Sequence, residues 1–236
     1  MVYPDMPTAI ITGASRGLGL ALARALADRG WNLVLDARGG DPLRAAAEEL
    51  SPKTQVVAVT GDVTDEGHRA ELVEAARALG GPDLLVNNAS LLGPSPQPKL
   101  AEYPLDDFKA VYEVNVTAPL ALIQLAMPLL AQSPQGRILN VTSDAGVEGY
   151  QGWGGYGSSK AALEQLSKVL AAEHPELKVW WVDPGDMNTK MHQEAYPDED
   201  ISDRPPPEES VPGILRLIDE DAPSGRYQAR ASEAVG

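Results

Sequence analysis

The stretch TAIITGASRGLG, residues 8–19, decides the fold that the sequence predicts. Residues 8–14 form a short apolar run, typical of a buried strand, that leads directly into a glycine-rich turn. Apolar residues at helical spacing follow over 18–30 and end at Gly30. A turn between a strand and a helix N-terminus points backbone N–H groups at a phosphate. The alternative is an ordinary tight turn, but the surrounding strand and helix favour a nucleotide site.

The remainder of the chain repeats the alternation of strand and helix. Strands are predicted at 31–37, 54–63, 83–90, 136–143, 177–185 and, at an edge, 225–229, with helices at 42–51, 67–81, 105–132, 156–174 and 210–221. Residues 191–210 are polar and proline-rich and are predicted to form a loop.

Strands separated by helices imply parallel crossover units. We therefore expect an α/β fold: a Rossmann-type, doubly wound parallel β-sheet with helices on both faces. No change in composition indicates a second domain, so one domain should span residues 1–236, with a substrate loop at about 190–210.

The composition argues against several classes of function. The net charge is −15, from 19 basic and 34 acidic residues, which disfavours broad contacts with nucleic acid or an anionic membrane. No apolar run is long enough to span a membrane and no signal peptide is recognisable, so a cytoplasmic protein is expected. Cysteine is absent, which excludes disulfides and thiolate chemistry. The three histidines, His68, His174 and His192, are scattered, so we expect no metal site and a surface position for each.

A tyrosine and a lysine lie four residues apart where the helix at 156–174 begins. This spacing places Tyr156 and Lys160 on one helix face. A phenol has an ordinary pKa of about 10, too high for efficient proton exchange at neutral pH. A neighbouring ammonium lowers that pKa, so Tyr156 would give a proton to a carbonyl oxygen or take one from an alcohol. Alone, the pair also fits a surface tyrosine beside a solvated lysine.

Two further polar residues strengthen the catalytic interpretation. Ser143 ends the strand at 136–143, where its hydroxyl would hydrogen-bond the same substrate oxygen and stabilise developing negative charge. Asn115 lies inside the long helix at 105–132, where it would hold a water that links Lys160 to solvent. A satisfied structural amide is the alternative role for Asn115.

Asn115, Ser143, Tyr156 and Lys160 together resemble the catalytic tetrad of the short-chain dehydrogenase/reductase family, in its ordinary single-domain branch. The turn at 12–19 resembles the family's TGxxxGxG, and the resemblance extends from residue 8 to about residue 229. It implies an oxidoreductase that transfers hydride between nicotinamide C4 and a carbonyl or secondary alcohol, with Tyr156 as the acid and base. In this role Lys160 would also anchor the nicotinamide ribose.

The resemblance also implies the cofactor-binding residues. The glycine turn would hold the pyrophosphate, GDV (61–63) the adenine and PGDMNT (184–189) the nicotinamide, and NNAS (87–90) resembles the family's NNAG after the fourth strand. The expected residues are Gly13, Ser15, Arg16, Gly17, Leu18, Gly19, Arg38, Asp62, Val63, Asn88, Ala89, Tyr156, Lys160, Pro184, Gly185 and Thr189. Ser90 replaces the glycine of the family's NNAG, and we expect this small residue to perturb little.

The choice between NADP and NAD depends on the end of the second strand. In the family pattern the discriminating acid would fall at Ala37, which Arg38 follows, and Arg16 lies inside the glycine turn. Family members with arginines at these two places usually bind NADP, because the guanidinium suits a 2′-phosphate. NADP(H) is therefore favoured. Asp36 keeps NAD(H) possible, since a shift of one position would bring its carboxylate to the ribose 2′-hydroxyl.

The substrate is expected to be a small carbonyl compound or alcohol. Its pocket should be lined by the segment between Ser143 and Tyr156, with Ala145, Tyr150 and Trp153 on the wall, and by the loop after Thr189. Trp153 would equally suit a subunit interface. The acidic loop at 191–210 is interpreted as a solvated lid.

Two other classes of function stay open at this stage. The first is an NAD(P)-binding sensor or scaffold protein without turnover, and the second is a purely structural α/β subunit. As in the family, we expect a homodimer or homotetramer paired through the helices at 105–132 and 156–174, whose apolar faces equally suit burial against the sheet.

Overall fold

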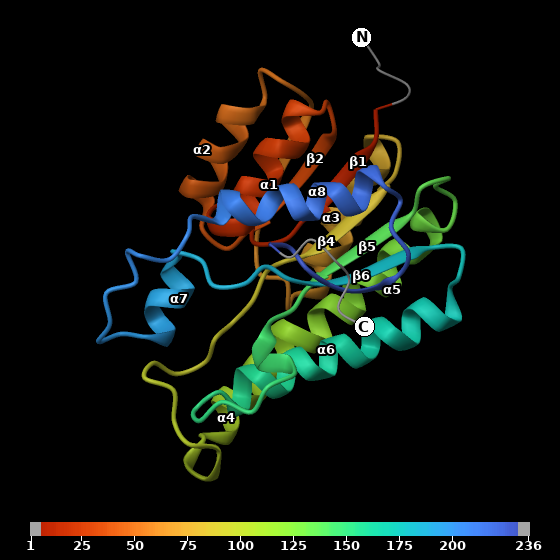
Figure 1. Ribbon diagram of the computed structural model, residues 1–236. Helices are drawn as coiled ribbons and strands as arrows, with labels where there is room; N and C mark the ends of the chain where they lie inside the picture. The colour runs from red at the N-terminus through yellow and green to blue at the C-terminus, as the bar shows by residue number, and fades with distance from the viewer. Residues whose placement is uncertain (1–5, 231–236) are drawn as a thin grey trace.

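The protein, described by a computed structural model over residues 6–230, is built around one parallel sheet in the order β3-β2-β1-β4-β5-β6-β7. The strands are β1 (Thr8–Ile11), β2 (Asn32–Ala37), β3 (Val56–Thr60), β4 (Leu84–Asn87), β5 (Arg137–Val141), β6 (Lys178–Asp183) and β7 (Gly225–Gln228). All six pairings are parallel, which confirms the predicted doubly wound fold (Figure 1).

Helices cover both faces of the sheet. Helices α1 (Gly17–Asp28), α2 (Gly40–Leu50) and α8 (Val211–Asp219) pack on one face, and α3 (Glu66–Ala78), α5 (Ala118–Leu130) and α6 (Gly154–Glu173) pack on the other (Figure 1). Neighbouring residues of a strand point to opposite faces, so Ile11 joins the first core and Ile10 the second. Both layers are needed because every residue of β1, β2, β4 and β5 is buried.

The strand order reverses direction next to β1. The chain moves outward from β1 to β2 and β3, then returns to the other side of β1 with β4 and continues to β7. Loops at the carboxyl ends of β1 and β4 therefore diverge and leave a crevice between them. This crevice contains the candidate site.

The predicted helical segment over 105–132 is helical as far as Leu130, but it is not one regular α-helix. The structure has α4 (Leu105–Tyr112), a π-helical turn η2 (Glu113–Thr117) and then α5, which ends at Leu130. Pro119 lies in the first turn of α5 and has no N–H to donate to the carbonyl of Asn115, four residues earlier. The missing donor accounts for an irregular turn here. By length and composition alone 105–130 could cross a membrane, but Leu122, Ile123 and Ala126 pack into the core.

The prediction of a loop at 191–210 was wrong at the two ends of this segment. This segment contains most of the short helix α7 (Lys190–Ala195) and the 3-10 turn η4 (Pro207–Ser210). Thr189 starts α7 as its N-cap, because its hydroxyl oxygen accepts a hydrogen bond from the N–H of His192 at 3.2 Å. Two further 3-10 turns, η1 (Leu100–Glu102) and η3 (Asp144–Gly146), complete the structure.

Candidate active site

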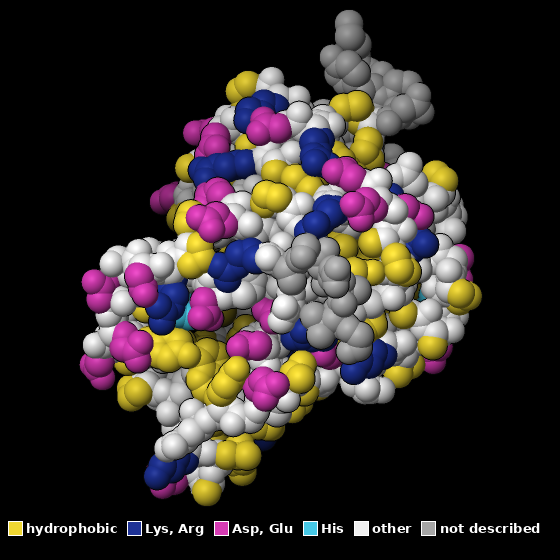
Figure 2. Space-filling model, in the orientation of Figure 1, with side chains coloured by type: hydrophobic (Ala, Val, Ile, Leu, Met, Phe, Trp, Pro, Cys, Tyr) yellow, Lys and Arg dark blue, Asp and Glu magenta, His cyan; other side chains and the backbone are white. Residues whose placement is uncertain are grey.

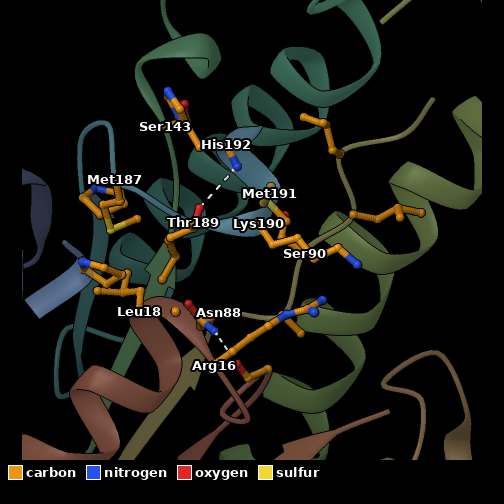
Figure 3. Close-up of a pocket in the computed structure, with 18 of the residues that line it drawn as sticks. Arg16, Leu18, Asn88, Ser90, Ser143, Met187, Thr189, Lys190, Met191 and His192 are labelled. Carbon is orange, nitrogen blue, oxygen red and sulfur yellow. Dashed lines mark hydrogen bonds between the residues drawn. The ribbon is translucent and has the colours of Figure 1, made fainter. Parts of the chain in front are cut away.

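A cleft of about 1220 Å³ opens at the carboxyl ends of the strands. Its walls come from the glycine turn, the ends of β2 and β3, the segments after β4, β5 and β6, and the N-terminal turn of α6. Figure 3 shows Arg16, Leu18 and Asn88 on one side of it, Ser143 and His192 on the other, and Thr189 between them. Figure 2 shows hydrophobic side chains with acidic ones around them on the face between α7 and α4.

The glycine turn is held in a form that only glycine allows at two positions. Gly13 has a φ of +66°, and a Cβ there would lie 3.0 Å from the Cα of Ala89. At Gly19 a Cβ would lie 2.6 Å from Nδ2 of Asn88 and 2.6 Å from the carbonyl oxygen of Gly13. The turn, the start of α1 and the end of β4 are thus packed backbone to backbone. Ser15, Arg16, Gly17 and Leu18 line the cleft beside them, as predicted.

Asn88 and Thr12 support this turn from below. The Asn88 side chain donates to the carbonyl oxygens of Thr12 (2.8 Å) and Gly13 (3.2 Å). The Thr12 hydroxyl in turn accepts from the N–H groups of Asn88 and Ala89, both at 3.0 Å. Thr12 opens the TGxxxGxG-like turn but was not among the predicted site residues. These four hydrogen bonds hold the glycine turn against the end of β4.

Asp36 is paired inside the protein. It lies in β2 on the face that packs against α3, and its Oδ1 lies 2.6 Å from Nε2 of His68, while its Oδ2 accepts from the N–H of Gly13 at 3.3 Å. The prediction that His68 lies on the surface was wrong, because its ring is buried over the backbone of Gly61. Burial raises the pKa of Asp36, and the His68 contact partly offsets this. Both oxygens of the Asp36 carboxylate therefore have partners inside the protein.

The residues at the ends of β2 and β3 shape the adenine end. Ala37 is the last residue of β2, and the exposed Arg38 follows it into the cleft. Asp62 and Val63 also line the cleft. Burial acts to raise the pKa of Asp62, but two hydrogen bonds from Thr64 and the charge of Arg38 outweigh it, so that pKa is lowered. Arg38 thus lies near enough to Asp62 to act on its charge.

Pro184, Gly185 and Thr189 form the opposite border. Gly185 has a φ of +70°, and its N–H donates to the side chain of Asp183 at 2.9 Å. The Thr189 methyl lies over the glycine turn, 3.8 Å from the place of a Cβ on Gly17. The Thr189 hydroxyl oxygen caps α7, which leaves its proton free to donate into the cleft.

Tyr156 and Lys160 lie together on the buried face of α6. The Lys160 Nζ lies 5.3 Å from the centroid of the Tyr156 ring and donates to the carbonyl oxygen of Val141 at 2.8 Å. Burial lowers the pKa of Lys160 to about 8. The expectation of a lowered phenol pKa is not met, because burial, the largest influence, raises the pKa of Tyr156.

Asn115 is fully bonded by its neighbours. Its Oδ1 accepts from the N–H of Leu91 (2.8 Å) and the hydroxyl of Ser90 (3.2 Å). Its Nδ2 donates to the carbonyl of Leu91 (2.9 Å) and the hydroxyl of Ser159 (3.0 Å). The π-helical turn places this amide between the loop after β4 and α6. The amide thus matches the structural role weighed above, and Ser90 provides one of the two donors to its Oδ1.

Ser143 lies two residues after the end of β5 and lines the cleft. It caps η3: its hydroxyl accepts from the N–H of Ala145 at 3.2 Å and donates to the carboxylate of Asp144 at 2.9 Å. Asp144 also accepts from the phenol of Tyr150 at 3.0 Å. Ser143, Tyr156 and Lys160 line the same cleft, so the structure brings these three predicted residues together.

An aromatic cluster lines the substrate end. The Trp153 ring centroid lies 5.7 Å from that of Tyr156, 6.0 Å from Tyr196 and 6.5 Å from Tyr150. Trp153 is thus on the cleft wall, where one of its two expected roles placed it. Ala145 is not on the wall; it is buried behind Tyr156. The lining also includes apolar residues that were not among the predicted site residues, namely Leu91, Leu92, Met187, Met191 and Ala195.

Charged side chains form no metal centre here. Within residues 6–230 no group of three or more His, Asp or Glu side chains could hold a metal ion. His192 lies at the cleft beside Tyr196, with ring centroids 5.0 Å apart, and burial lowers its pKa.

Known proteins share this fold and site. The short chain dehydrogenase family profile matches residues 7–200. The chain is 35% identical to sepiapterin reductase of Rattus norvegicus over 199 residues, 79% of this chain and 76% of the relative. It is also 35% identical, over 186 residues, to an NADPH-dependent pterin aldehyde reductase of Arabidopsis thaliana, with 78% of this chain and 76% of the relative covered.

Solved structures agree. A short chain dehydrogenase of Shigella flexneri, in complex with NADP, has a TM-score of 0.89 at 28% identity, over 98% of this chain and 99% of that chain. The chain therefore belongs to the short chain dehydrogenase family, whose members are NAD(P)-dependent oxidoreductases.

Proposed function

We propose that this chain is an NADP(H)-dependent reductase of aromatic carbonyl compounds, with Tyr156 as the acid and base. The observation that carries the proposal is the meeting of Ser143, Tyr156 and Lys160 on one wall of the cleft that the glycine turn also borders. Ser143 follows β5 and the other two residues lie on α6, and the cleft of about 1220 Å³ that they line is large enough for a dinucleotide and a small substrate.

The cleft fits NADP(H) on its own chemistry. The glycine turn leads into the N-terminus of α1, where backbone N–H groups suit a pyrophosphate, and close packing of Gly19 against Asn88 and Gly13 fixes the turn in this place. Arg16 and Arg38 are exposed at the rim and can pair with a 2′-phosphate. The Asp36 carboxylate, which would oppose a 2′-phosphate, is buried against His68. The NADP complex of the Shigella flexneri relative supports the same choice.

The reaction divides between cofactor and protein. Bound NADPH supplies the hydride chemistry. The Ser143 hydroxyl, which donates to Asp144 in the free chain, turns to the carbonyl oxygen of the substrate and stabilises its developing charge. Tyr156 gives its phenolic proton to that oxygen, and the ammonium of Lys160, 5.3 Å from the ring, stabilises the resulting phenolate. The charge of Lys160 is thus needed after the proton has left.

The walls indicate a flat substrate. Trp153 and Tyr196 present aromatic surfaces, and Met191 and Leu92 add apolar ones. Such a pocket suits a ring system that carries a ketone or aldehyde. The names of the rat and Arabidopsis relatives point to pterin carbonyl compounds as the first candidates.

The first measurement is a fluorescence titration of the purified chain with NADPH and with NADH. Tight NADPH binding and weak NADH binding are expected. Turnover is then measured with sepiapterin and a pterin aldehyde, with cyclohexanone as a non-aromatic control. Failure to bind either nucleotide would contradict the oxidoreductase proposal and favour a structural subunit.

Tyr156→Phe separates an enzyme from a cofactor-binding sensor. We expect turnover to fall by about 10²–10⁴-fold with NADPH binding retained, since general acid–base catalysis contributes about that factor. Tyr112→Phe, outside the cleft, is the matched control and should keep full activity. A chain that binds NADPH but shows no Tyr156-dependent turnover would favour the sensor.

Homo-oligomerisation is a separate proposal. A shallow groove between α5 and α6 is lined by Leu120, Ile123, Leu163 and Leu166, the apolar faces expected to pair in a homodimer or homotetramer. Light scattering after size-exclusion chromatography tests this; a monomer at micromolar concentration would contradict it.

A further inference from the structure

The Asp144 carboxylate lies directly beside the hydroxyl that the proposed function assigns to the substrate carbonyl. Its Oδ1 accepts from the Ser143 hydroxyl at 2.9 Å, and its Oδ2 accepts from the phenol of Tyr150 at 3.0 Å. Asp144 begins the turn η3, is exposed and lines the cleft. Burial is the largest influence that raises the pKa of Tyr156 and of Tyr196, and the charge of Asp144 adds to it in both. The carboxylate therefore lies close enough to act on the phenol of the catalytic wall and on the aromatic cluster.

The carboxylate keeps its place when Ser143 turns to a substrate. The N–H of Ala145 also donates to Oδ1 of Asp144, at 2.8 Å, and the Tyr150 phenol holds Oδ2. The Ser143 hydroxyl has one proton, so it cannot donate to Asp144 and to a substrate carbonyl at once. When it turns to the carbonyl, Oδ1 loses one of its two donors. A bound substrate that covers this oxygen from water must therefore supply a donor of its own.

Basic side chains near the substrate end lie against other acids. The pairs are Arg226 with Glu164 and Asp183, and His192 and Arg204 with Asp186. Lys160 donates to the carbonyl of Val141. Of the ion pairs that form between residues 6 and 230, none includes Asp144. A positive group on the substrate would thus have no cation of the protein to displace from this carboxylate.

We propose that Asp144 selects aryl carbonyl substrates in which a hydrogen-bond donor, best a protonated amine, lies one or two carbons from the carbonyl. The Ser143 proton goes to the carbonyl oxygen, and the amine donates to Oδ1 of Asp144 in its place. A hydrogen bond of about 2.8 Å from Ser143 to that oxygen keeps Asp144 within about 6 Å of it, a span that such an amine bridges. Asp144 is thus a specificity residue. The inference names the substrate class of the proposed function and rests on it.

Three aryl ketones of similar chain length test this preference: 3-aminopropiophenone, a cation at neutral pH, neutral butyrophenone and anionic 3-benzoylpropionate. Steady-state kinetics with NADPH compare the parent with Asp144→Asn, whose amide oxygen still accepts from Ser143. Asp144→Asn should lower kcat/KM for the amine about tenfold, since a hydrogen bond between charged groups contributes at least about that factor. The value for butyrophenone should stay within about twofold, and that for 3-benzoylpropionate should rise, because a like charge is removed.

Two further variants support the comparison. Asp144→Ser also removes the charge and serves if the amide disturbs the turn. Glu148→Gln is the matched control, because Glu148 is an exposed acid of the same segment that does not line the cleft. It should leave the kcat/KM values of all three ketones unchanged.

Calorimetric titration of the chain loaded with NADP⁺, which has no hydride to transfer, measures ketone binding without turnover. Asp144→Asn should weaken binding of the amine about tenfold and binding of butyrophenone by less than about twofold. An equal effect of Asp144→Asn on all three ketones, or none on the amine, would overturn the proposal, since Asp144 would then only support the turn and Ser143. A parent that reduces none of the ketones, or a Tyr156→Phe chain with full turnover, would contradict the proposed function instead. The calorimetric result decides the role of Asp144 in either case.

Discussion

Oδ1 of Asp36 lies 2.6 Å from Nε2 of His68, in a buried contact that joins β2 to α3 beneath the adenine end of the cleft. The contact decides a question of cofactor choice. Since Ala37, and not Asp36, ends β2, and since the Asp36 carboxylate is also bonded to the N–H of Gly13, it belongs to the support of the glycine turn. The rim is left to Arg16 and Arg38.

Arg38→Gln should weaken NADPH binding about tenfold to a hundredfold, because a hydrogen bond between charged groups contributes about 1.5–3 kcal/mol. NADH, which lacks the 2′-phosphate, should bind almost as before. Asp36→Asn is the matched variant; it should lower stability but leave the ratio of the two affinities unchanged. Calorimetric titration with both nucleotides measures the ratio, and a selective loss of NADH affinity in Asp36→Asn would show that Asp36 acts at the ribose.

Gly19→Ala should abolish detectable NADPH binding and destabilise the chain by about 1–3 kcal/mol, a typical cost of overpacking. The new Cβ would lie 2.6 Å from Nδ2 of Asn88 and 2.6 Å from the Gly13 carbonyl oxygen, so the turn must open. Gly149→Ala is the control, since a Cβ there meets nothing within 4 Å. Normal NADPH affinity in Gly19→Ala, measured by fluorescence, would contradict the tight backbone packing.

Arg226→Met should cost about 3–5 kcal/mol of stability, the usual effect of removing one partner from a buried ion pair. Arg226 lies 3.0 Å from the carboxylate of Glu164 and 3.4 Å from that of Asp183, and both acids are 5% exposed. It also donates to the carbonyl of Ser143 at 3.4 Å, so kcat should fall as well.

The exposed pair Arg77–Glu74 provides the control for Arg226. Arg77→Met should change the free energy of unfolding by less than about 1 kcal/mol. Urea denaturation of both variants gives the comparison. Equal small losses would mean that solvent reaches the Arg226 cluster.

Lys160→Met separates the cost of the buried ammonium from its function. The pKa of Lys160 is about 8 in the folded chain and ordinary in the unfolded chain. At a pH between the folded pKa of about 8 and the unfolded pKa of 10.5, the unfolded chain binds more protons than the folded chain. The free energy of unfolding of the parent therefore rises with pH in this range. Relative to Lys160→Met, the parent should gain about 2 kcal/mol between about pH 7 and pH 9.5.

Urea midpoints of parent and Lys160→Met at both pH values measure this gain. A constant difference between the two proteins would show that the ammonium titrates as in water. Turnover of Lys160→Met should be lost at either pH, because the phenolate then lacks its cation.

Much of the site could be predicted because its residues follow a local pattern. The glycine turn, Tyr156 with Lys160, and the segment from Pro184 to Thr189 each lie at a strand end or helix start, and parallel strands bring such ends to one edge of a sheet. The prediction failed where a distant partner decides. His68 of α3 is buried against Asp36, which β2 provides from 32 residues earlier in the chain. Ala145 of η3 packs in one buried cluster with Tyr156 of α6.

The sequence by itself determined the parallel α/β sheet, the nucleotide-binding turn and the residue types of the catalytic wall. Periodicity and glycine spacing are local properties, and they survive without knowledge of long-range contacts. The tertiary structure alone decided which polar groups are free. It pairs Asp36 with His68, and it bonds the Asn115 side chain to the loop after β4 and to Ser159 of α6. These roles depend on side chains from separate elements that meet in the interior, where a polar group without a hydrogen-bond partner is unfavourable.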